Sequence, residues 1–147
     1  MIHVFRTMTR ITRPRDEVFA FFSDAANLQR ITPPRLRFRI LTPLPIAMRS
    51  GAHIDYELSL MGVPFRWETL ISVWDPPHQF VDEQLRGPYK SWVHTHTFRE
   101  DPAGTVMEDE VRWSLPLFPF GQAAYPFVAR QIRSIFDYRE KAIRSML

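Results

Sequence analysis

The sequence predicts one α+β domain in which an antiparallel sheet of about seven strands is combined with a long C-terminal helix. Three patterns carry this prediction. Residues 52–113 contain five consecutive segments in which apolar and polar side chains alternate, as they do in half-buried strands. A strand and two short helical segments precede them. Residues 124–146 carry apolar side chains at helical spacing.

The composition is that of a single globular domain. The chain has 147 residues, of which 45% are hydrophobic and 14% aromatic, enough to build a core. No repeat, linker-like stretch or low-complexity segment divides it, so we expect one domain over residues 1–147. The absence of cysteine excludes a disulfide framework, a thiolate zinc site and a cysteine nucleophile.

The charge pattern argues against nucleic-acid and membrane partners. The formal net charge is only +3, whereas nucleic-acid binders usually show a clustered basic face. The nearest cluster, Arg35, Arg37 and Arg39, alternates with apolar residues and is typical of a strand with one solvated face. Apolar stretches are interrupted by charges too often to span a membrane, and residues 1–4 lack the features of a signal peptide. We therefore expect a cytoplasmic protein without stable membrane insertion.

The N-terminal segments read as a strand followed by two short helices. Residues 2–11 are rich in β-forming side chains. Pro14 suits the first turn of a helix, and Asp24 can cap a second one. Prolines at 33 and 34 must end that second helix, because proline disfavours helix at the preceding residue.

Two further segments follow these helices. Residues 35–41 alternate and are expected to form the second strand. Residues 43–51 form a loop that is unusually apolar, with Leu44, Ile46 and Met48, and we expect it to act as a partly covered lid or entrance.

The most regular hairpin lies on either side of Met61-Gly62. A two-residue loop there gives one register that agrees on both faces. The expected pairs are Leu60 with Val63, Leu58 with Phe65, Tyr56 with Trp67 and, on the outer face, Glu57 with Arg66. Met61 is not an ideal residue for such a loop, so the turn type stays open.

Polar residues of the next strands converge on the same inner face. Pairing through the turn at 75–78 matches Val73 with Phe80, Ile71 with Asp82 and Thr69 with Gln84. Turns at Gly87-Pro88 and at 100–103 then place His94 opposite both Asp82 and Asp109. Trp92, His96 and Phe98 share the face of His94. Buried imidazoles and carboxylates are costly unless they pair or serve a ligand.

The C-terminal helix follows a proline-containing connection over residues 115–120. Its apolar side comprises Ala124, Phe127, Val128, Ile132, Ile135, Phe136, Ile143 and Met146. Pro126 either occupies the first turn or kinks the helix. Arg139 falls on this apolar stripe, so we expect it to pair with Asp82 or Asp109. The alternative is a packed stem with its head in water.

This order of elements resembles the helix-grip fold of the SRPBCC superfamily, which includes START-like lipid carriers, the birch-pollen-allergen group and polyketide cyclase/dehydrase-like proteins. The segments that carry the resemblance best are ITRPRDEVFAFFSDAANLQRITP, FVDEQLRGPYKSWVHTHTF and IFDYR. The chain is most similar to a bacterial stand-alone ligand-binding or cyclase-like branch. The resemblance implies a curved sheet wrapped around the last helix, with an apolar cavity between them. The superfamily has no shared catalytic motif, so no catalytic residue is transferred.

A cavity of this kind implies a small hydrophobic partner, such as an aromatic, polyketide or isoprenoid-like compound. The expected wall and ligand-binding residues are Tyr56, Trp67, Ile71, Gln84, Trp92, His96, Phe98, Met107, Trp113 and Arg139. Leaning on the resemblance, we expect a monomer or weak homodimer that uses no cofactor.

The cluster of Asp82, His94, His96 and Asp109 has three interpretations. It is structural if every imidazole is paired with a carboxylate. It is catalytic if Asp109 or Asp82 orients His94 as a general acid or base. It is a metal site if these good ligands bind an ion, which we do not expect because the superfamily rarely uses metals.

Three functions remain open from the sequence. The first is ligand binding in the cavity, and the second is a cyclase/dehydratase-like reaction at His94. The third is a protein-interaction module that uses outward-facing apolar residues such as Leu70, Trp74, Val81 and Val93. No serine nucleophile elbow, phosphate-binding glycine loop or dinucleotide fingerprint is present.

Overall fold

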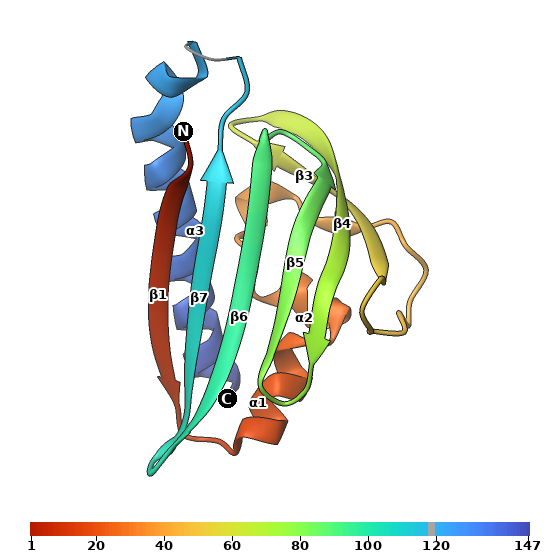
Figure 1. Ribbon diagram of the computed structural model, residues 1–147, viewed down its shortest axis with the longest axis vertical. Coiled ribbons are helices and arrows are strands. Elements are labelled where there is room, and N and C mark those ends of the chain that lie inside the picture. The colour runs from red at the N-terminus through yellow and green to blue at the C-terminus, as the bar shows by residue number, and fades with distance from the viewer. Residues whose placement is uncertain (118–119) are drawn as a thin grey trace.

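The computed structural model describes residues 1–117 and 120–147, which form one seven-stranded sheet that curves around a long helix (Figure 1). All neighbouring strands are antiparallel, in the order β1-β7-β6-β5-β4-β3-β2. The elements are β1 (His3–Ile11), α1 (Arg15–Phe22), α2 (Ala25–Arg30), a 3₁₀ helix (Pro34–Leu36), β2 (Arg39–Ile40), β3 (His53–Leu60), β4 (Val63–Asp75), β5 (Gln79–Arg86), β6 (Ser91–Asp101), β7 (Gly104–Ser114), a second 3₁₀ helix (Phe120–Ala124) and α3 (Tyr125–Met146). This confirms the predicted helix-grip architecture.

The two short helices begin where their capping residues predict. Pro14 precedes α1, whose first turn contains two acidic residues at the positive end of the helix. The Asp24 carboxylate accepts a hydrogen bond from the Ala26 N–H at 3.0 Å and so caps α2. Phe19, on the buried side of α1, packs against Phe98 of the sheet and fixes these helices against it.

The segment 35–41 is mostly not a strand, and this prediction was wrong. Pro34 starts a 3₁₀ turn, and Arg37 then adopts a left-handed conformation with φ of 48°. Only Arg39–Ile40 pairs with β3. The three arginines therefore share no strand face: Arg35 donates to Ser134 of α3, and Arg39 pairs with Glu57.

The β3–β4 hairpin has the predicted register in every pair, including Tyr56 with Trp67 and Glu57 with Arg66. Met61 and Gly62 both have positive φ, 51° and 80°, which is the signature of a type I′ turn. This turn matches the twist of the strands, so it outweighs the cost of a left-handed methionine. Trp67 is only 5% exposed, as the register requires.

The β4–β5 ladder contains an irregularity that shifts the expected faces. Ile71 pairs with Asp82 and Thr69 with Gln84 as predicted, but the register then slips between Ile71 and Val73. Beyond this bulge Trp74, not Val73, lies opposite Phe80. Val73 is consequently 38% exposed.

This shift also changes the set of outward apolar residues. Trp74, expected on the outer face, packs against Phe19 and Phe80. Leu70, Val81 and Val93 are half-buried rather than exposed. The outer face therefore offers less apolar surface than the sequence suggested.

The apolar side of α3 packs into the concave face of the sheet. Val128, Ile132 and Phe136 join one core cluster, and Ile143 joins another around Phe98 and Met107. Pro126 lies in the first turn of α3, so it does not kink the helix. Part of the predicted 115–120 connection, residues 118 and 119, lies outside the described residues. None of the helices in the described ranges combines the length and apolar character that a membrane span needs.

Packing of α3 on the sheet should dominate the stability of the domain. We expect Ile132→Ala to lower the free energy of unfolding by about 2–5 kcal/mol, since it leaves a cavity in the core. Phe127 was predicted on the same apolar side but is 69% exposed, whereas Ile132 is 1% exposed. Phe127→Ala is therefore the matched control and should change stability by less than about 0.5 kcal/mol. Urea unfolding of both variants measures the difference, and equal losses would contradict this account.

Candidate functional site

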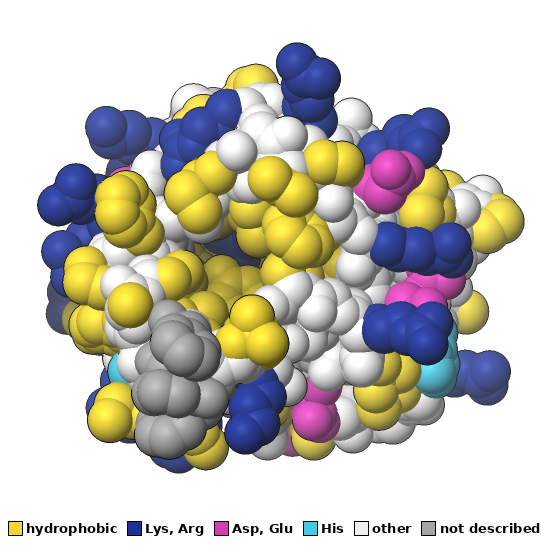
Figure 2. Space-filling model, turned by 90° about the horizontal axis from the view of Figure 1, so that it is seen from above, with side chains coloured by type: hydrophobic (Ala, Val, Ile, Leu, Met, Phe, Trp, Pro, Cys, Tyr) yellow, Lys and Arg dark blue, Asp and Glu magenta, His cyan; other side chains and the backbone are white. Residues whose placement is uncertain are grey.

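A cavity of about 150 Å³ lies between the sheet, α3 and the short helices. Its wall is mainly apolar and aromatic, with Phe38, Trp67, Trp92 and Phe136 among the lining residues. Figure 2 shows a hollow surrounded by hydrophobic side chains on the upper end of the molecule. Leu60, the last residue of β3, also lines the cavity. A concave apolar site with few polar groups is the usual form of a small-molecule pocket.

Several predicted site residues lie on this wall. They are Tyr56, Trp67, Ile71, Asp82, Trp92, His94, His96 and Arg139. They come from β3, β4, β5, β6 and α3, and the alternation of each strand brings them to one face.

Other predicted site residues are near the cavity but do not line it. Phe98, Met107 and Trp113 are at most 2% exposed and belong to the packed core. They lie where helices pack directly on β6 and β7, so the cavity does not extend to their side chains. Gln84 turns to the backbone of Tyr89, to which it both donates and accepts hydrogen bonds. Asp109 is buried beneath the two histidines.

Sequence reasoning missed the part of the wall supplied by the α1–β3 region. Leu28 of α2, Leu36 of the first 3₁₀ helix and Phe38 all line the cavity. Their positions depend on the non-repetitive chain path around Arg37, which alternation cannot predict. Met48, from the loop expected to cover an entrance, also lines the cavity, and its apolar character was the available signal.

Asp82, His94, His96 and Asp109 form a closed cluster, the carboxylate–imidazole quartet. Asp82 pairs with His94 across β5 and β6 as predicted. Asp109 was predicted opposite His94, but the β6–β7 register places it opposite His96, with Val111 opposite His94. The prediction of the pairing partner was therefore wrong by one step along the inner face.

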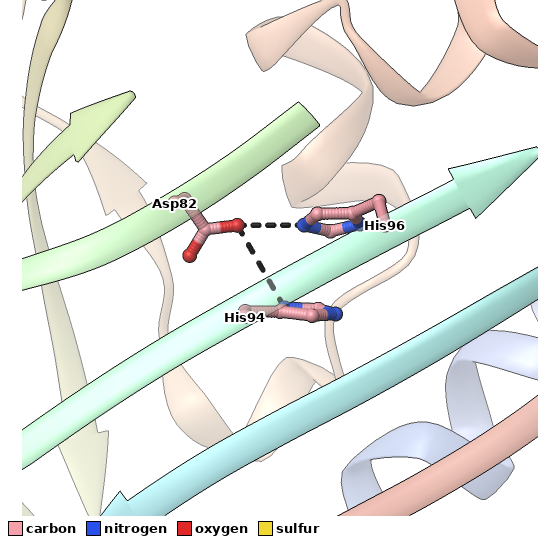
Figure 3. Close-up of side chains that lie close together, drawn as sticks. All are labelled: Asp82, His94 and His96. Atoms are coloured by element: carbon pink, nitrogen blue, oxygen red, sulfur yellow. Dashed lines mark hydrogen bonds and ion pairs between the residues drawn. The ribbon is translucent and has the colours of Figure 1, made fainter. Parts of the chain in front are cut away.

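Each carboxylate of the quartet contacts both imidazoles. Asp109 Oδ1 lies 2.7 Å from His94 Nε2 and 3.4 Å from His96 Nδ1. Asp82 Oδ2 lies 2.6 Å from His96 Nε2 and 3.7 Å from His94 Nδ1 (Figure 3). The two imidazole rings stack with 3.7 Å between their centroids. The predicted carboxylate–imidazole–carboxylate row is thus present, with a second imidazole closing it into a ring.

The quartet sets the charge of each member. Burial favours the neutral acid of Asp109, but hydrogen bonds from His94 and His96 outweigh it and hold the pKa of Asp109 far below its usual range. The pKa of Asp82 is also lowered, because the imidazoles outweigh burial. Burial opposes the imidazolium of His96, yet hydrogen bonds with Asp109 and Asp82 raise its pKa. Burial and the adjacent His96 charge lower the pKa of His94. The cluster therefore carries one imidazolium and one neutral imidazole between two carboxylates.

Arg139 reaches the cavity but does not form the predicted ion pair. Its guanidinium carbon lies 4.9 Å from the centre of the Phe136 ring. Among the described residues it has no carboxylate partner within 4.0 Å, and its Nε is buried without a hydrogen-bond acceptor. Its charge acts on Asp82 only at longer range, where it helps to lower the pKa of that carboxyl. Asp82 is already engaged by two imidazoles, which removes the partner that the sequence suggested.

Asp82, His94 and His96 also have the chemistry of a metal-binding set. One ligand atom from each lies within 4.8 Å of the others. In the described structure, however, His96 Nε2 and Asp82 Oδ2 are engaged in a hydrogen bond of 2.6 Å. His94 Nε2 is likewise held by Asp109. The hydrogen bonds within the quartet account for these donors and acceptors without an ion.

The two histidines should give opposite pH dependences of stability. The pKa of His96 is raised above 6.5, so its contribution is present below that value and is lost as pH rises through the folded-state pKa. The pKa of His94 is lowered below 6.5, so its contribution is lost as pH falls, because the unfolded chain then binds the proton more readily. Asp82 and Asp109 both face the two rings and stay ionised throughout this range.

We therefore expect His96→Asn to cost most stability at acidic pH and His94→Asn to cost most at alkaline pH. Urea unfolding of the parent protein and both variants, between about pH 5 and pH 9, gives the loss of unfolding free energy of each variant at each pH. If this loss changes with pH in the same direction for both variants, the assignment of one charged and one neutral ring is contradicted.

Comparisons with known proteins agree with this fold. The family model described as polyketide cyclase/dehydrase and lipid transport matches residues 11–136. The Zhui aromatase/cyclase from Streptomyces sp. R1128 superposes with a TM-score of 0.79 at 13% identity, covering 97% of this chain and 92% of that chain. The match and this neighbour confirm the resemblance to the SRPBCC superfamily.

Two other solved structures are similar over nearly their whole length. Protein CV1439 from Chromobacterium violaceum has a TM-score of 0.76 at 15% identity, covering 99% of this chain and 97% of that chain. Ginseng major latex-like protein 151 from Panax ginseng has a TM-score of 0.66 at 11% identity, with the same 99% and 97% coverage. At such identities these likenesses establish the fold alone. No curated protein sequence matches the chain.

Proposed function

The chain belongs to the polyketide cyclase/dehydrase and lipid transport family, and from this premise we propose that it binds a small hydrophobic ligand in the cavity between the sheet and α3. The observation that carries the proposal is the aromatic cavity itself. Close-packed interiors leave few voids larger than a water molecule. A space of about 150 Å³ in the centre of a 147-residue domain is therefore a site for an occupant.

The wall supports an apolar occupant held at one polar side. Trp67 and Trp92 meet edge to face on β4 and β6, and Tyr56 stacks beside Trp67. Flat aromatic surfaces of this kind suit a planar ring, because aromatic pairs gain energy beyond the area that they bury. Polar atoms on the same wall come from Asp82, His94, His96 and Arg139 and can orient the ligand.

Binding can be tested with a neutral aromatic probe. We expect ethylbenzene to bind saturably and to shift the indole N–H signals of Trp67 and Trp92 in NMR spectra. Native mass spectrometry of the purified protein should in addition detect any ligand that co-purifies. Absence of saturable binding in the cavity by every aromatic probe would overturn the proposal.

A substitution in the wall of the cavity should block this binding. Leu60 lines the cavity, whereas its cross-strand partner Val63 is 52% exposed. We expect Leu60→Trp to weaken ethylbenzene binding by at least about tenfold, because the larger ring occupies the space of the probe. Val63→Trp adds the same ring one step away and should leave binding unchanged. Equal effects of both variants, measured by NMR titration, would show that the probe binds elsewhere.

A second candidate function is acid–base catalysis at His94, favoured by one specific contact. Asp109 holds Nε2 of His94 at 2.7 Å, and Asp109 is ionised, so Nδ1 carries the free electron pair of a neutral ring. Such an oriented imidazole on a cavity wall is the arrangement of a general base. The superfamily resemblance makes a cyclase- or dehydratase-like reaction the natural case.

The quartet can balance the protons of a dehydration. His94 Nδ1 takes the α-proton of a β-hydroxy carbonyl compound, and its C–H electrons form the new double bond as the C–O bond breaks. The leaving hydroxide takes a proton from the His96 imidazolium and departs as water. Asp82 Oδ2 lies between the two rings, so a proton passing from His94 to His96 restores the starting state.

Proton exchange separates this candidate from simple binding. We expect the protein to accelerate deuterium exchange at the α-carbon of an aromatic 1,3-diketone such as benzoylacetone, followed by NMR. His94→Asn should slow exchange by about 10²-fold or more, since it removes the base. Thr95→Val, one residue away on the other face of β6, is the control. Exchange that is equally fast in the His94 variant would reject catalysis at this residue.

A further inference from the structure

Among the described residues, two hydrogen-bond donors on the cavity wall lack an acceptor. The indole Nε1 of Trp67 and the Nε of Arg139 are buried and have no acceptor within the described parts of the chain. Nδ1 of His96 also has no hydrogen bond of good geometry, but it lies 3.4 Å from Asp109 Oδ1, so its partner is within the quartet. Trp67 and Arg139 both line the cavity. Unpaired buried donors are rare, and each costs free energy unless something else satisfies it.

Tyr56 adds another donor to this set. Its hydroxyl oxygen accepts a hydrogen bond from Thr69 Oγ1 at 3.3 Å, so its own hydrogen remains free to donate. Burial, followed by the charge of Asp82, raises the pKa of Tyr56, which keeps the hydroxyl protonated. Tyr56 also lines the cavity and stacks near Trp67. A ligand that complements these donors must therefore carry hydrogen-bond acceptors.

The charge on the wall is not balanced by a direct partner. The guanidinium of Arg139 cannot lose its proton. In the described structure it lies against the Phe136 ring and has no carboxylate within 4.0 Å. The nearest acid of the wall, Asp82, already faces two imidazoles. The half-buried guanidinium of Arg139 therefore has donors that an anion from outside the chain can engage.

The volume limits the size of that anion. A void of about 150 Å³ in a protein core accommodates a molecule of about the size of benzene. The surrounding rings of Trp67, Trp92 and Phe136 suit a flat ligand. A long apolar chain would not fit without enlargement of the cavity.

From these donors, this charge and this volume we infer that the ligand is a monocyclic aromatic carboxylate. This inference rests on the proposed binding function and names the class of its ligand. The carboxylate accepts hydrogen bonds from Arg139, a charge-assisted interaction. Trp67 Nε1 and the Tyr56 hydroxyl supply further donors for its oxygens. The ring fills the aromatic part of the cavity.

The test compares three probes of one shape: phenylacetate, phenylacetamide and ethylbenzene. Calorimetric and NMR titrations are done at pH 7.5 in a buffer without carboxylates. We expect phenylacetate to bind at least about tenfold more tightly than phenylacetamide, because only the acid presents a charge to Arg139. Ethylbenzene should bind most weakly.

Variants then assign the preference to Arg139. Arg139→Gln and Arg139→Met should bring the acid-to-amide ratio of affinities close to one, whereas Arg139→Lys should retain part of it. Arg133 lies on the same helix but is exposed, so Arg133→Met is the matched control and should keep the full ratio. Melting curves of each variant exclude loss of fold as the cause.

The outcomes separate this inference from the binding function on which it rests. If all three probes bind with similar affinity, the inference is overturned and the binding function stands. If the acid is preferred but the preference survives in both neutral Arg139 variants, the recognition assigned to Arg139 is wrong. If no probe binds, both proposals fail.

Discussion

The packing of a single helix into a concave sheet is the constraint on which the structure depends. Strands about 4.8 Å apart make a seven-stranded sheet roughly 29 Å wide, whereas a helix with its side chains is about 10–12 Å across. One helix therefore cannot cover the whole inner face. In this protein α3 packs with β1, β7 and part of β6, and the remaining width over β3–β5 becomes the cavity. The short helices and the 43–51 loop close its other side.

The carboxylates buried on the inner face of the sheet must be stabilised by groups other than solvent. Two carboxylates alone would be strongly destabilised there, and two neutral imidazoles would leave both negative charges uncompensated. The quartet shares its protons so that each ring touches both acids. With His96 charged and His94 neutral, its net charge is −1, and the nearby Arg139 offsets this at longer range. The arrangement stabilises the fold and also leaves a neutral imidazole facing the cavity.

The sequence was a good guide wherever a two-residue period ran without interruption. The β3–β4 register and the inward direction of His94 and His96 followed from alternation alone. Prediction failed at one bulge and at one turn. The bulge near Val73 turned Trp74 inward. The β6–β7 ladder is regular, but it turns at residues 102–103, so Asp109 lies two residues from the expected register. The helical stripe predicted that Arg139 faces the cavity, but not its lack of a partner. Pairing depends on how Asp82 is shared in space, and no local pattern contains that information.

The quartet and the unpartnered donors differ in a way that separates structural from binding roles. In the quartet each carboxylate accepts a hydrogen bond from the Nε2 of one ring and lies within 4.0 Å of the other ring, so its bonds contribute to stability without a ligand. Trp67 Nε1 and Arg139 Nε have no such partner among the described residues, which lowers the stability of the domain when no ligand is bound. A molecule that binds the folded state alone stabilises it by RT ln(1 + [L]/Kd). A ligand that accepts hydrogen bonds from these donors would remove their destabilising effect. Occupancy of the cavity is therefore coupled to the stability of the fold.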